Sequence, residues 1–168
     1  VRRAIPDVAL STDVIVAFPG ETHEEFLDTL ALVRTVRFDD AFTYRYSPRE
    51  GTPATRLPAD DFVPDDIAQA RLEELIEVAR AVQSEIAGSE VGRVEEVLVE
   101  RPGRHPGQVM GRTRRGKAVA FDGPPEWIGS YRAVRLESTT GATFGGSAVE
   151  APRPLASGER YPAETATA

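Results

Sequence analysis

The stretch from Asp13 to Thr22 constrains the fold of this 168-residue chain most strongly. A continuous apolar run from Val14 to Phe18 stops at Pro19-Gly20, and such a run is typical of a fully buried strand. Thr22 and Glu25 then have the spacing of a capping box, which predicts that a helix starts at once. Because chemistry in α/β sheets collects at the turns after strand ends, we expect this turn to face a ligand.

The residues around this stretch predict one βαβ unit. Strands are expected over 8–18 and 41–46, and a helix over 24–37 that places Phe26, Leu27, Leu30 and Val33 on one face. Such an order favours parallel pairing of the two strands. One unit cannot bury both faces of its sheet, and the chain begins at Val1 rather than Met. We therefore expect a fragment of a longer protein, such as the end of a larger barrel, and expect 1–88 to be unstable alone.

The periodicity of the sequence changes near residue 90. A loop with four prolines over 47–64 leads into a long helix that is expected to stop at Gly88. Short alternating segments follow, which predict five strands over 94–101, 108–112, 118–121, 131–138 and 142–149. Five short strands in about 60 residues suit a small Greek-key barrel of the OB type, a common nucleic-acid binder. The Pro- and Ala-rich tail over 151–168 is expected to be disordered.

Charge is divided between the two expected units. Residues 1–90 carry 9 basic and 18 acidic side chains, whereas residues 91–150 carry 9 basic and 7 acidic ones. Six Arg and Lys residues and His105 lie between Arg101 and Phe121 with no acid among them, which would suit a phosphate backbone. The chain has no cysteine, so it can hold neither a disulfide nor a cysteine-ligated cluster. No apolar stretch is long enough to span a membrane, and a cytoplasmic location is expected.

Three ordered motifs resemble the MiaB-type tRNA methylthiotransferases, which are radical S-adenosylmethionine (SAM) enzymes. Residues 12–22 are similar to the family pattern TD-I-I-V-G-F-P-G-E-T, and residues 46–54 to Y-S-P-R-P-G-T-P-A. Met110-Gly-Arg-Thr, with Lys117, Val119, Phe121 and Gly123, resembles the start of the terminal TRAM domain of the family. Ala17 stands where the family usually has Gly, and Glu50 where it usually has Pro.

The resemblance implies a fold and an activity for the full-length enzyme. A domain with three cysteines and one 4Fe-4S cluster precedes a partial (β/α) barrel, whose Cys-x3-Cys-x2-Cys motif holds a second 4Fe-4S cluster that cleaves SAM. A TRAM domain then binds tRNA, and a methylthio group is added to C2 of N6-isopentenyl-adenosine beside the anticodon. This chain would supply the end of the radical SAM barrel (1–90) and the TRAM domain (91–150). It would be inactive alone, because the six cysteines would lie upstream.

The cofactor residues expected from the resemblance lie at the ends of the first two strands. They would line the cavity for SAM or substrate: Ile15, Ala17, Phe18, Pro19, Gly20, Tyr46, Ser47 and Arg49. Simpler roles compete, namely barrel core for the apolar residues, a plain turn for Pro19 and Gly20, and loop packing for the others. No catalytic or metal-ligating residue is expected in this chain.

The residues expected to contact the tRNA backbone are Arg112, Arg114, Arg115 and Lys117. The competing interpretation is a solvated hairpin, and Phe121 and Trp127 are expected in the core. The expected partners are the anticodon stem-loop of tRNA and the upstream part of the same polypeptide, with the enzyme monomeric. Two alternatives stay open: a fragment of a ribosomal-protein methylthiotransferase, and a non-catalytic RNA-binding module of the TRAM type.

Overall fold

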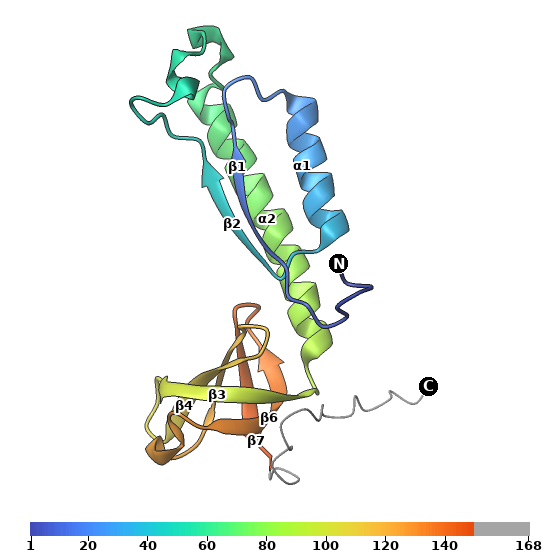
Figure 1. Ribbon diagram of the computed structural model, residues 1–168, viewed down its shortest axis with the longest axis vertical. Helices are drawn as coiled ribbons and strands as arrows, with labels where there is room; N and C mark the ends of the chain where they lie inside the picture. The colour runs from blue at the N-terminus through green and yellow to red at the C-terminus, as the bar shows by residue number, and fades with distance from the viewer. Residues whose placement is uncertain (150–168) are drawn as a thin grey trace.

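The computed structural model describes residues 1–149, so the tail expected to be disordered (151–168) lies outside the described residues. A βαβ unit lies at one end of the molecule and a barrel at the other, and one long helix runs from the first to the second (Figure 1). The elements in chain order are β1 (Ser11–Val16), α1 (His23–Val36), β2 (Asp40–Arg45), η1 (Pro53–Arg56), η2 (Ala59–Asp61), α2 (Asp65–Glu90), β3 (Val94–Pro102), β4 (Gln108–Thr113), β5 (Ala118–Asp122), η3 (Pro125–Trp127), β6 (Tyr131–Thr139) and β7 (Thr143–Ala148).

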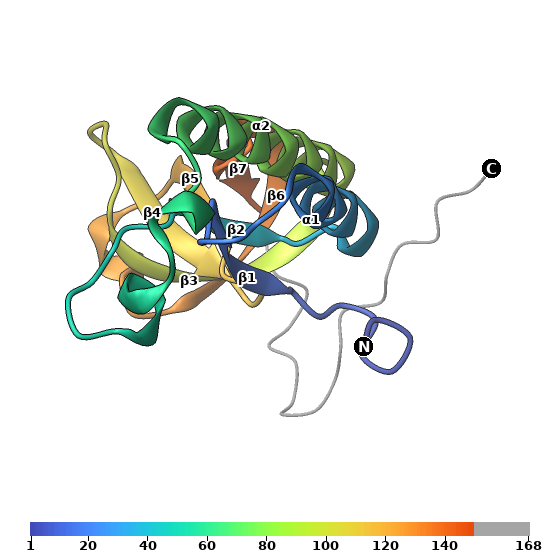
Figure 2. The same cartoon turned by 90° about the horizontal axis from the view of Figure 1, so that it is seen from above.

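The expected βαβ unit is present, and its two strands pair in parallel from Ser11↔Asp40 to Val16↔Arg45. Both helices lie on the same side of the strands (Figure 2), and their apolar side chains pack there against Val14, Val16 and Ala41. The capping box at the start of α1 is also confirmed, since Thr22 and Glu25 satisfy each other's backbone N–H groups. The prediction for Leu27 was wrong, because this side chain is exposed on α1.

Three predicted boundaries were wrong by two residues or more, and one of them is the start of the first strand, which was expected at residue 8 but lies at Ser11. The first strand was expected to reach Phe18 but ends at Val16, since Ala17 adopts a left-handed φ of 59° that no strand contains. The long helix was expected to stop at Gly88 but continues to Glu90. The glycine with a left-handed conformation after this helix is Gly92, with φ 93°.

The second half of the described chain forms the expected five-stranded barrel. It is closed in the order β3-β4-β5-β7-β6, with antiparallel pairs throughout except the parallel pair β5–β7. Its core contains valines from four strands together with Phe121, Leu136 and Phe144, and Ala87 from the end of α2 joins the same core. Trp127 packs against this core from η3, which confirms that the two aromatic residues are structural.

Gly111 of the Met-Gly-Arg-Thr motif lies where β3 and β4 approach most closely. A Cβ atom at this position would lie 2.2 Å from the backbone oxygen of Leu98, far inside contact distance. We therefore expect Gly111→Ala to lower the free energy of unfolding by about 1–3 kcal/mol, measured by urea denaturation. The matched control is Gly88→Ala, where a Cβ meets nothing within 4 Å and a helical alanine should stabilise by about 1 kcal/mol. Equal effects of the two substitutions would contradict this account.

None of the helices in residues 1–149 combines the length and apolar character needed to cross a membrane.

Candidate functional site

One face of the β1–β2 sheet has no covering layer among the described residues. Side chains alternate along each strand, so the face opposite the two helices carries Ile15, Phe42 and Tyr44, all about half exposed. Ile15 pairs in register with Tyr44, and Asp13 pairs with Phe42, so these side chains form one continuous surface. Because parallel sheets are normally covered on both sides, this exposed apolar surface is the candidate contact face of the unit.

The turn from β1 to α1 is held by one buried carboxylate. Oε2 of Glu21 accepts a hydrogen bond from the backbone N–H of Ala17 at 2.7 Å and from Nη1 of Arg71 at 2.7 Å. The same guanidinium nitrogen donates to the backbone oxygen of Glu21, and the Arg71 side chain lies over the ring of Phe26. The backbone N–H of Gly20, with φ 89°, donates to the carbonyl of Asp61. Most of the first motif therefore builds the turn itself.

Ala17 pays a conformational cost at this turn because its φ of 59° is a conformation that glycine adopts freely. A left-handed non-glycine residue costs about 1–2 kcal/mol, part of which Ala17 recovers through its buried methyl group. We expect Ala17→Gly to raise the free energy of unfolding by about 0.5–1 kcal/mol in a denaturant titration. Gly20→Ala should instead lower the free energy of unfolding. If Ala17→Gly also lowers it, Ala17 is not strained in the folded state.

Three aromatic rings meet beyond the ends of β1 and β2. Phe18 lies against Tyr46 edge to face with centroids 5.0 Å apart, and Phe62 lies 6.4 Å from Tyr46. The hydroxyl group of Tyr46 is buried but has no hydrogen-bond partner among the described residues, which is costly unless a ligand or water supplies one.

The eight expected cofactor residues divide into two groups in the structure. Ala17 and Pro19 are buried, and Tyr46 is half-buried in the aromatic cluster. The remaining five are exposed along the uncovered face or the rim beside it: Ile15, Phe18, Gly20, Ser47 and Arg49. The backbone oxygen of Arg49 accepts a hydrogen bond from the hydroxyl of Thr52 at 2.8 Å, which holds this part of the loop.

The chemistry of these residues suits an adenosyl ligand but not an iron–sulfur cluster. Exposed apolar side chains beside an unpartnered hydroxyl group can pack against a nucleoside and bond to it. Cluster irons need thiolate ligands, and the sequence has no cysteine. Within residues 1–149, no group of three or more His, Asp or Glu side chains is placed to hold a metal ion.

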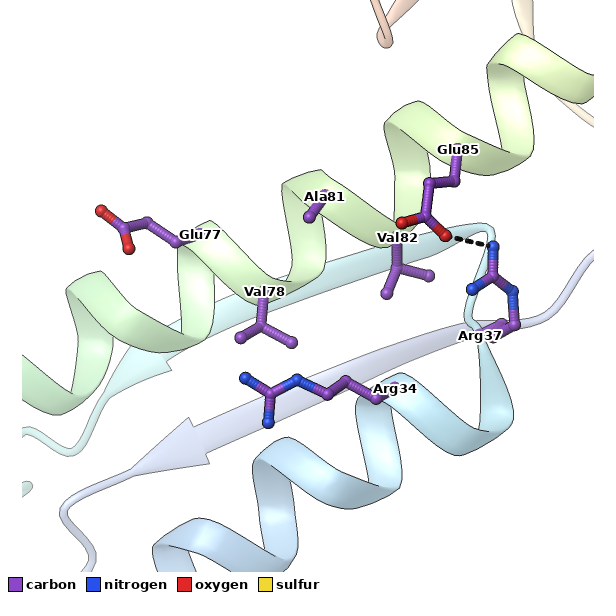
Figure 3. A pocket seen from close by; sticks show the side chains of 7 residues that line it. All are labelled: Arg34, Arg37, Glu77, Val78, Ala81, Val82 and Glu85. Atoms are coloured by element: carbon purple, nitrogen blue, oxygen red, sulfur yellow. Dashed lines mark ion pairs between the residues drawn. The ribbon is translucent and has the colours of Figure 1, made fainter.

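Two surface hollows lie outside the uncovered face. One of about 330 Å³ lies between the Gly20 turn and the loop that leads into α2, with Asp60, Asp61 and Arg71 in its lining. The other, of about 490 Å³, is the groove between α1 and α2, where Arg37 pairs with Glu85 at one end and Arg34 lies along Val78 (Figure 3). The first hollow also has a buried nitrogen without a partner among the described residues, Nε of Arg71, but it lies beside the sheet face rather than on it, and the groove between the helices has no such group.

The four residues expected to contact tRNA point in two directions. Arg112 and Arg114 are exposed on the barrel, where they lie near Glu100 and Glu96 respectively. Arg115 and Lys117 instead point into the junction between the barrel and the βαβ unit. Arg115 bonds to the carboxylates of Asp39 and Glu90, and Nζ of Lys117 donates to the backbone oxygen of Asp39 at 2.7 Å.

Glu95 lies half-buried near this junction. Burial, and then the charge of Glu90, raise the pKa of its carboxyl above the ordinary value of 4.5, while Arg93 and Arg115 oppose this effect and Asp7 adds to it. A raised folded-state pKa means that the fold disfavours the ionised form. Stability should therefore fall as pH rises from about 4.5 through the folded-state pKa, and stay lower above it.

We therefore expect Glu95→Gln to stabilise the protein at pH 7 but not at pH 4, where the carboxyl group is already protonated. Thermal unfolding at several pH values measures this difference, with Glu96→Gln at the next position as the control. A stability gain that does not depend on pH would contradict the assignment.

Sequence reasoning missed the residues that organise the junction and the turn. The sequence did not single out Asp39, Glu90 or Arg71 as organising residues. A helical pattern does offer one signal for Arg71, because it lies four residues before Leu75 on the buried face of α2. No local pattern could link Asp39 to Arg115, which lies 76 residues further along the chain.

Comparisons with known proteins agree with this division of the chain. Residues 88–149 match the TRAM domain family. A tRNA-2-methylthio-N(6)-dimethylallyladenosine synthase of Clostridium botulinum (strain Langeland / NCTC 10281 / Type F) is 44% identical over 137 residues, which cover 81% of this chain and 30% of that protein. A protein of the same name from Acetivibrio thermocellus is 41% identical over 150 residues, covering 89% and 31%.

A third relative, from Clostridium novyi (strain NT), has the same name and is 38% identical over 149 residues. The chain spans about a third of the length of these curated relatives. The match extends beyond the barrel into the βαβ unit, since it covers more residues than the TRAM domain alone. The chain therefore contains a TRAM domain at residues 88–149 and is similar, over most of its length, to the C-terminal part of proteins named tRNA-2-methylthio-N(6)-dimethylallyladenosine synthase.

Proposed function

We propose that this chain is the C-terminal portion of a radical SAM enzyme that adds a methylthio group to C2 of N6-isopentenyl-adenosine next to the anticodon of tRNA. Residues 1–90 would form the end of the radical SAM barrel, and residues 91–150 the tRNA-binding domain. The printed names of the relatives support a tRNA substrate over a ribosomal protein. In this proposal the enzyme works in the cytoplasm as a monomer.

The observation that carries the proposal is the uncovered face of the β1–β2 sheet. In a (β/α) barrel the helices cover only the outer side of the strands. The end of such a barrel, separated from the other strands, therefore has two parallel strands with helices on one side only, as seen here. The relatives are about three times as long as this chain, which leaves room for those strands and for cluster-binding cysteines in an upstream part of the same polypeptide. On this basis the chain alone is inactive.

In the complete barrel the uncovered face would turn toward the cavity. Ile15, Phe18 and Tyr46 would hold the adenosyl group of SAM, with Arg49 and Ser47 at the rim. Bound SAM, together with the clusters held upstream, would supply the radical chemistry. SAM would also supply the methyl part of the methylthio group. The residues of this chain contribute apolar packing, a hydroxyl group for hydrogen bonding and exclusion of water from the cavity.

The experiment for the SAM site uses the full-length polypeptide that contains this chain. Ile15→Arg should weaken SAM binding by at least about tenfold in a titration, because it places an unpaired charge on the cavity wall. Leu32→Arg is the matched control, since Leu32 has the same 50–60% exposure on the outer side of α1. Equal SAM affinity in both variants would refute the assignment of this face.

The experiment for the barrel measures tRNA binding by the 168-residue chain at several salt concentrations. Exposed arginines that contact phosphates release counterions, so Arg112→Ala and Arg114→Ala should each weaken binding and reduce the slope of log K against log salt by about 1. The anticodon stem-loop alone should bind as the whole tRNA does. Unchanged affinity and slope in the double variant would rule out these two contacts.

A further inference from the structure

We infer that Arg115 and Lys117 are positioning residues, which fix the orientation of the TRAM barrel relative to the βαβ unit. The effect of this orientation on catalysis rests on the proposed function, because the orientation matters only if the barrel presents RNA to the SAM site. The contacts that fix the orientation do not depend on the proposed function. The group of residues involved is called the Asp39 junction and consists of Asp39, Glu90, Arg115 and Lys117.

Asp39 is the centre of the junction and belongs to the βαβ unit. Its side chain is only 2% exposed, and Oδ2 accepts a hydrogen bond from the backbone N–H of Leu10 at 2.9 Å. Its own N–H donates to the Leu10 oxygen at 2.8 Å. These two bonds fix Asp39 against the chain just before β1, so the carboxylate has a set position relative to the sheet.

The barrel reaches Asp39 with two side chains from the turn between β4 and β5. Arg115 bonds to Oδ1 of Asp39 with one guanidinium nitrogen and to the Glu90 carboxylate, only 6% exposed, with the other. Lys117 donates to the backbone oxygen of Asp39, and its Nζ lies 3.8 Å from Oδ2 of Asp40. One barrel turn is thus attached to the start of β2 and to the end of α2 at once.

This turn is itself closely held, so it can transmit an orientation. The N–H of Thr113 donates to the Lys117 oxygen at 2.9 Å, and the N–H of Gly116 donates to the Thr113 oxygen at 2.9 Å. The side chain of Arg112 bonds to the Gly116 oxygen at 2.9 Å. Arg115 and Lys117 therefore have defined positions relative to the barrel strands.

The second attachment between the two units is α2 itself. Ala87 enters the barrel core, and the N–H of Gly92 donates to the Leu136 oxygen at 2.7 Å. These contacts all lie at one end of the helix, beside Gly92 with its φ of 93°, and contacts at one point resist rotation less than contacts that lie far apart. The Asp39 junction adds contacts away from this point, and two separate attachments define one orientation.

The experiment measures the distance between two spin labels on the 168-residue chain, which has no native cysteine to interfere. The labels are attached through Thr35→Cys on α1 and Asp122→Cys at the end of β5, both exposed. We expect a narrow distance distribution in the parent chain and at least a twofold broader one after Arg115→Met. Arg114→Met is the matched control, because Arg114 is 82% exposed and pairs with Glu96 inside the barrel.

Two further variants keep the test decisive if Arg115→Met fails to fold. Combining it with Asp39→Asn and Glu90→Gln removes the unpaired charges, and this neutral set should also broaden the distribution. Lys117→Met keeps both carboxylates paired and should give a smaller broadening. A distribution as narrow as that of the parent chain in these two variants would overturn the inference and assign the orientation to α2 alone.

A second measurement separates this inference from the proposed function. In the full-length enzyme, the Lys117→Met variant should bind tRNA within twofold of the parent but turn over at least fivefold more slowly. If the parent enzyme binds no tRNA, the proposed function fails while the label distances still decide the role of the junction. Restored turnover in Lys117→Arg, which keeps a donor for Asp39, would support positioning.

Discussion

Replacing Arg115 with Met is expected to lower the free energy of unfolding by about 3–5 kcal/mol, the largest loss from any single substitution in the barrel turn. The reason is that Asp39 and Glu90 are both buried, with side chains 2% and 6% exposed. Without the guanidinium, the buried Glu90 carboxylate loses its ion-pair partner and Asp39 keeps only Arg2, whose Nη2 lies 3.6 Å from its Oδ2. Urea denaturation at pH 7 measures the loss.

Arg114→Met is the control for this prediction, and it should cost less than about 1 kcal/mol because Arg114 is largely exposed. The neutral set of Arg115→Met, Asp39→Asn and Glu90→Gln should recover most of the lost stability, since matched uncharged groups avoid the desolvation cost. Similar losses in Arg114→Met and Arg115→Met would mean that the junction contributes nothing beyond an ordinary surface pair.

The second large effect is expected at Glu21. Glu21→Ala removes the partner of Arg71, whose side chain is 9% exposed, and leaves the N–H of Ala17 without its acceptor. Breaking a buried pair from one side should cost about 3–5 kcal/mol. Because the pair joins the β1–α1 turn to α2, the loss should also expose the rim residues, which amide hydrogen exchange can follow.

Glu24→Ala is the matched control for Glu21→Ala, because Glu24 lies three residues later and is exposed in the first turn of α1. It should cost only about 0.3–1 kcal/mol through the loss of a favourable charge at the helix start. Glu21→Gln keeps an oxygen acceptor, so its loss of stability should lie between the losses of Glu21→Ala and Glu24→Ala. A Glu21→Ala variant as stable as Glu24→Ala would show that the turn does not depend on this carboxylate.

The elements that local patterns control were predictable from the sequence. The five barrel strands follow from alternating side chains, and the parallel β1–β2 pair follows from the intervening helix. A small barrel of the OB type was expected from the number and length of the strands, but the parallel β5–β7 pair that closes it was not predicted. Boundaries failed where a single backbone conformation decided them, as at Ala17 and at Gly88.

The candidate sites were less predictable because they depend on long-range contacts. A run of basic residues gives their charge but not their direction, so Arg114 and Arg115 looked alike in sequence. One is exposed and the other joins two units because β4 and β5 place consecutive side chains of the turn on opposite sides. The roles of the eight rim residues toward SAM and of the four basic barrel residues toward tRNA stay predictions, and the junction contacts of Arg115 and Lys117 leave these two less available to an RNA.

The position of the barrel along α2 sets a minimum size for anything that uses both ends of this chain. The helix has 26 residues and is therefore about 39 Å long, with the rim of β1 and β2 near its start and the barrel at its end (Figure 1). A free nucleoside cannot reach across that length, which corresponds to on the order of ten stacked base pairs. An RNA shorter than this length should therefore be able to bind the barrel or the rim, but not both at once, whatever its sequence.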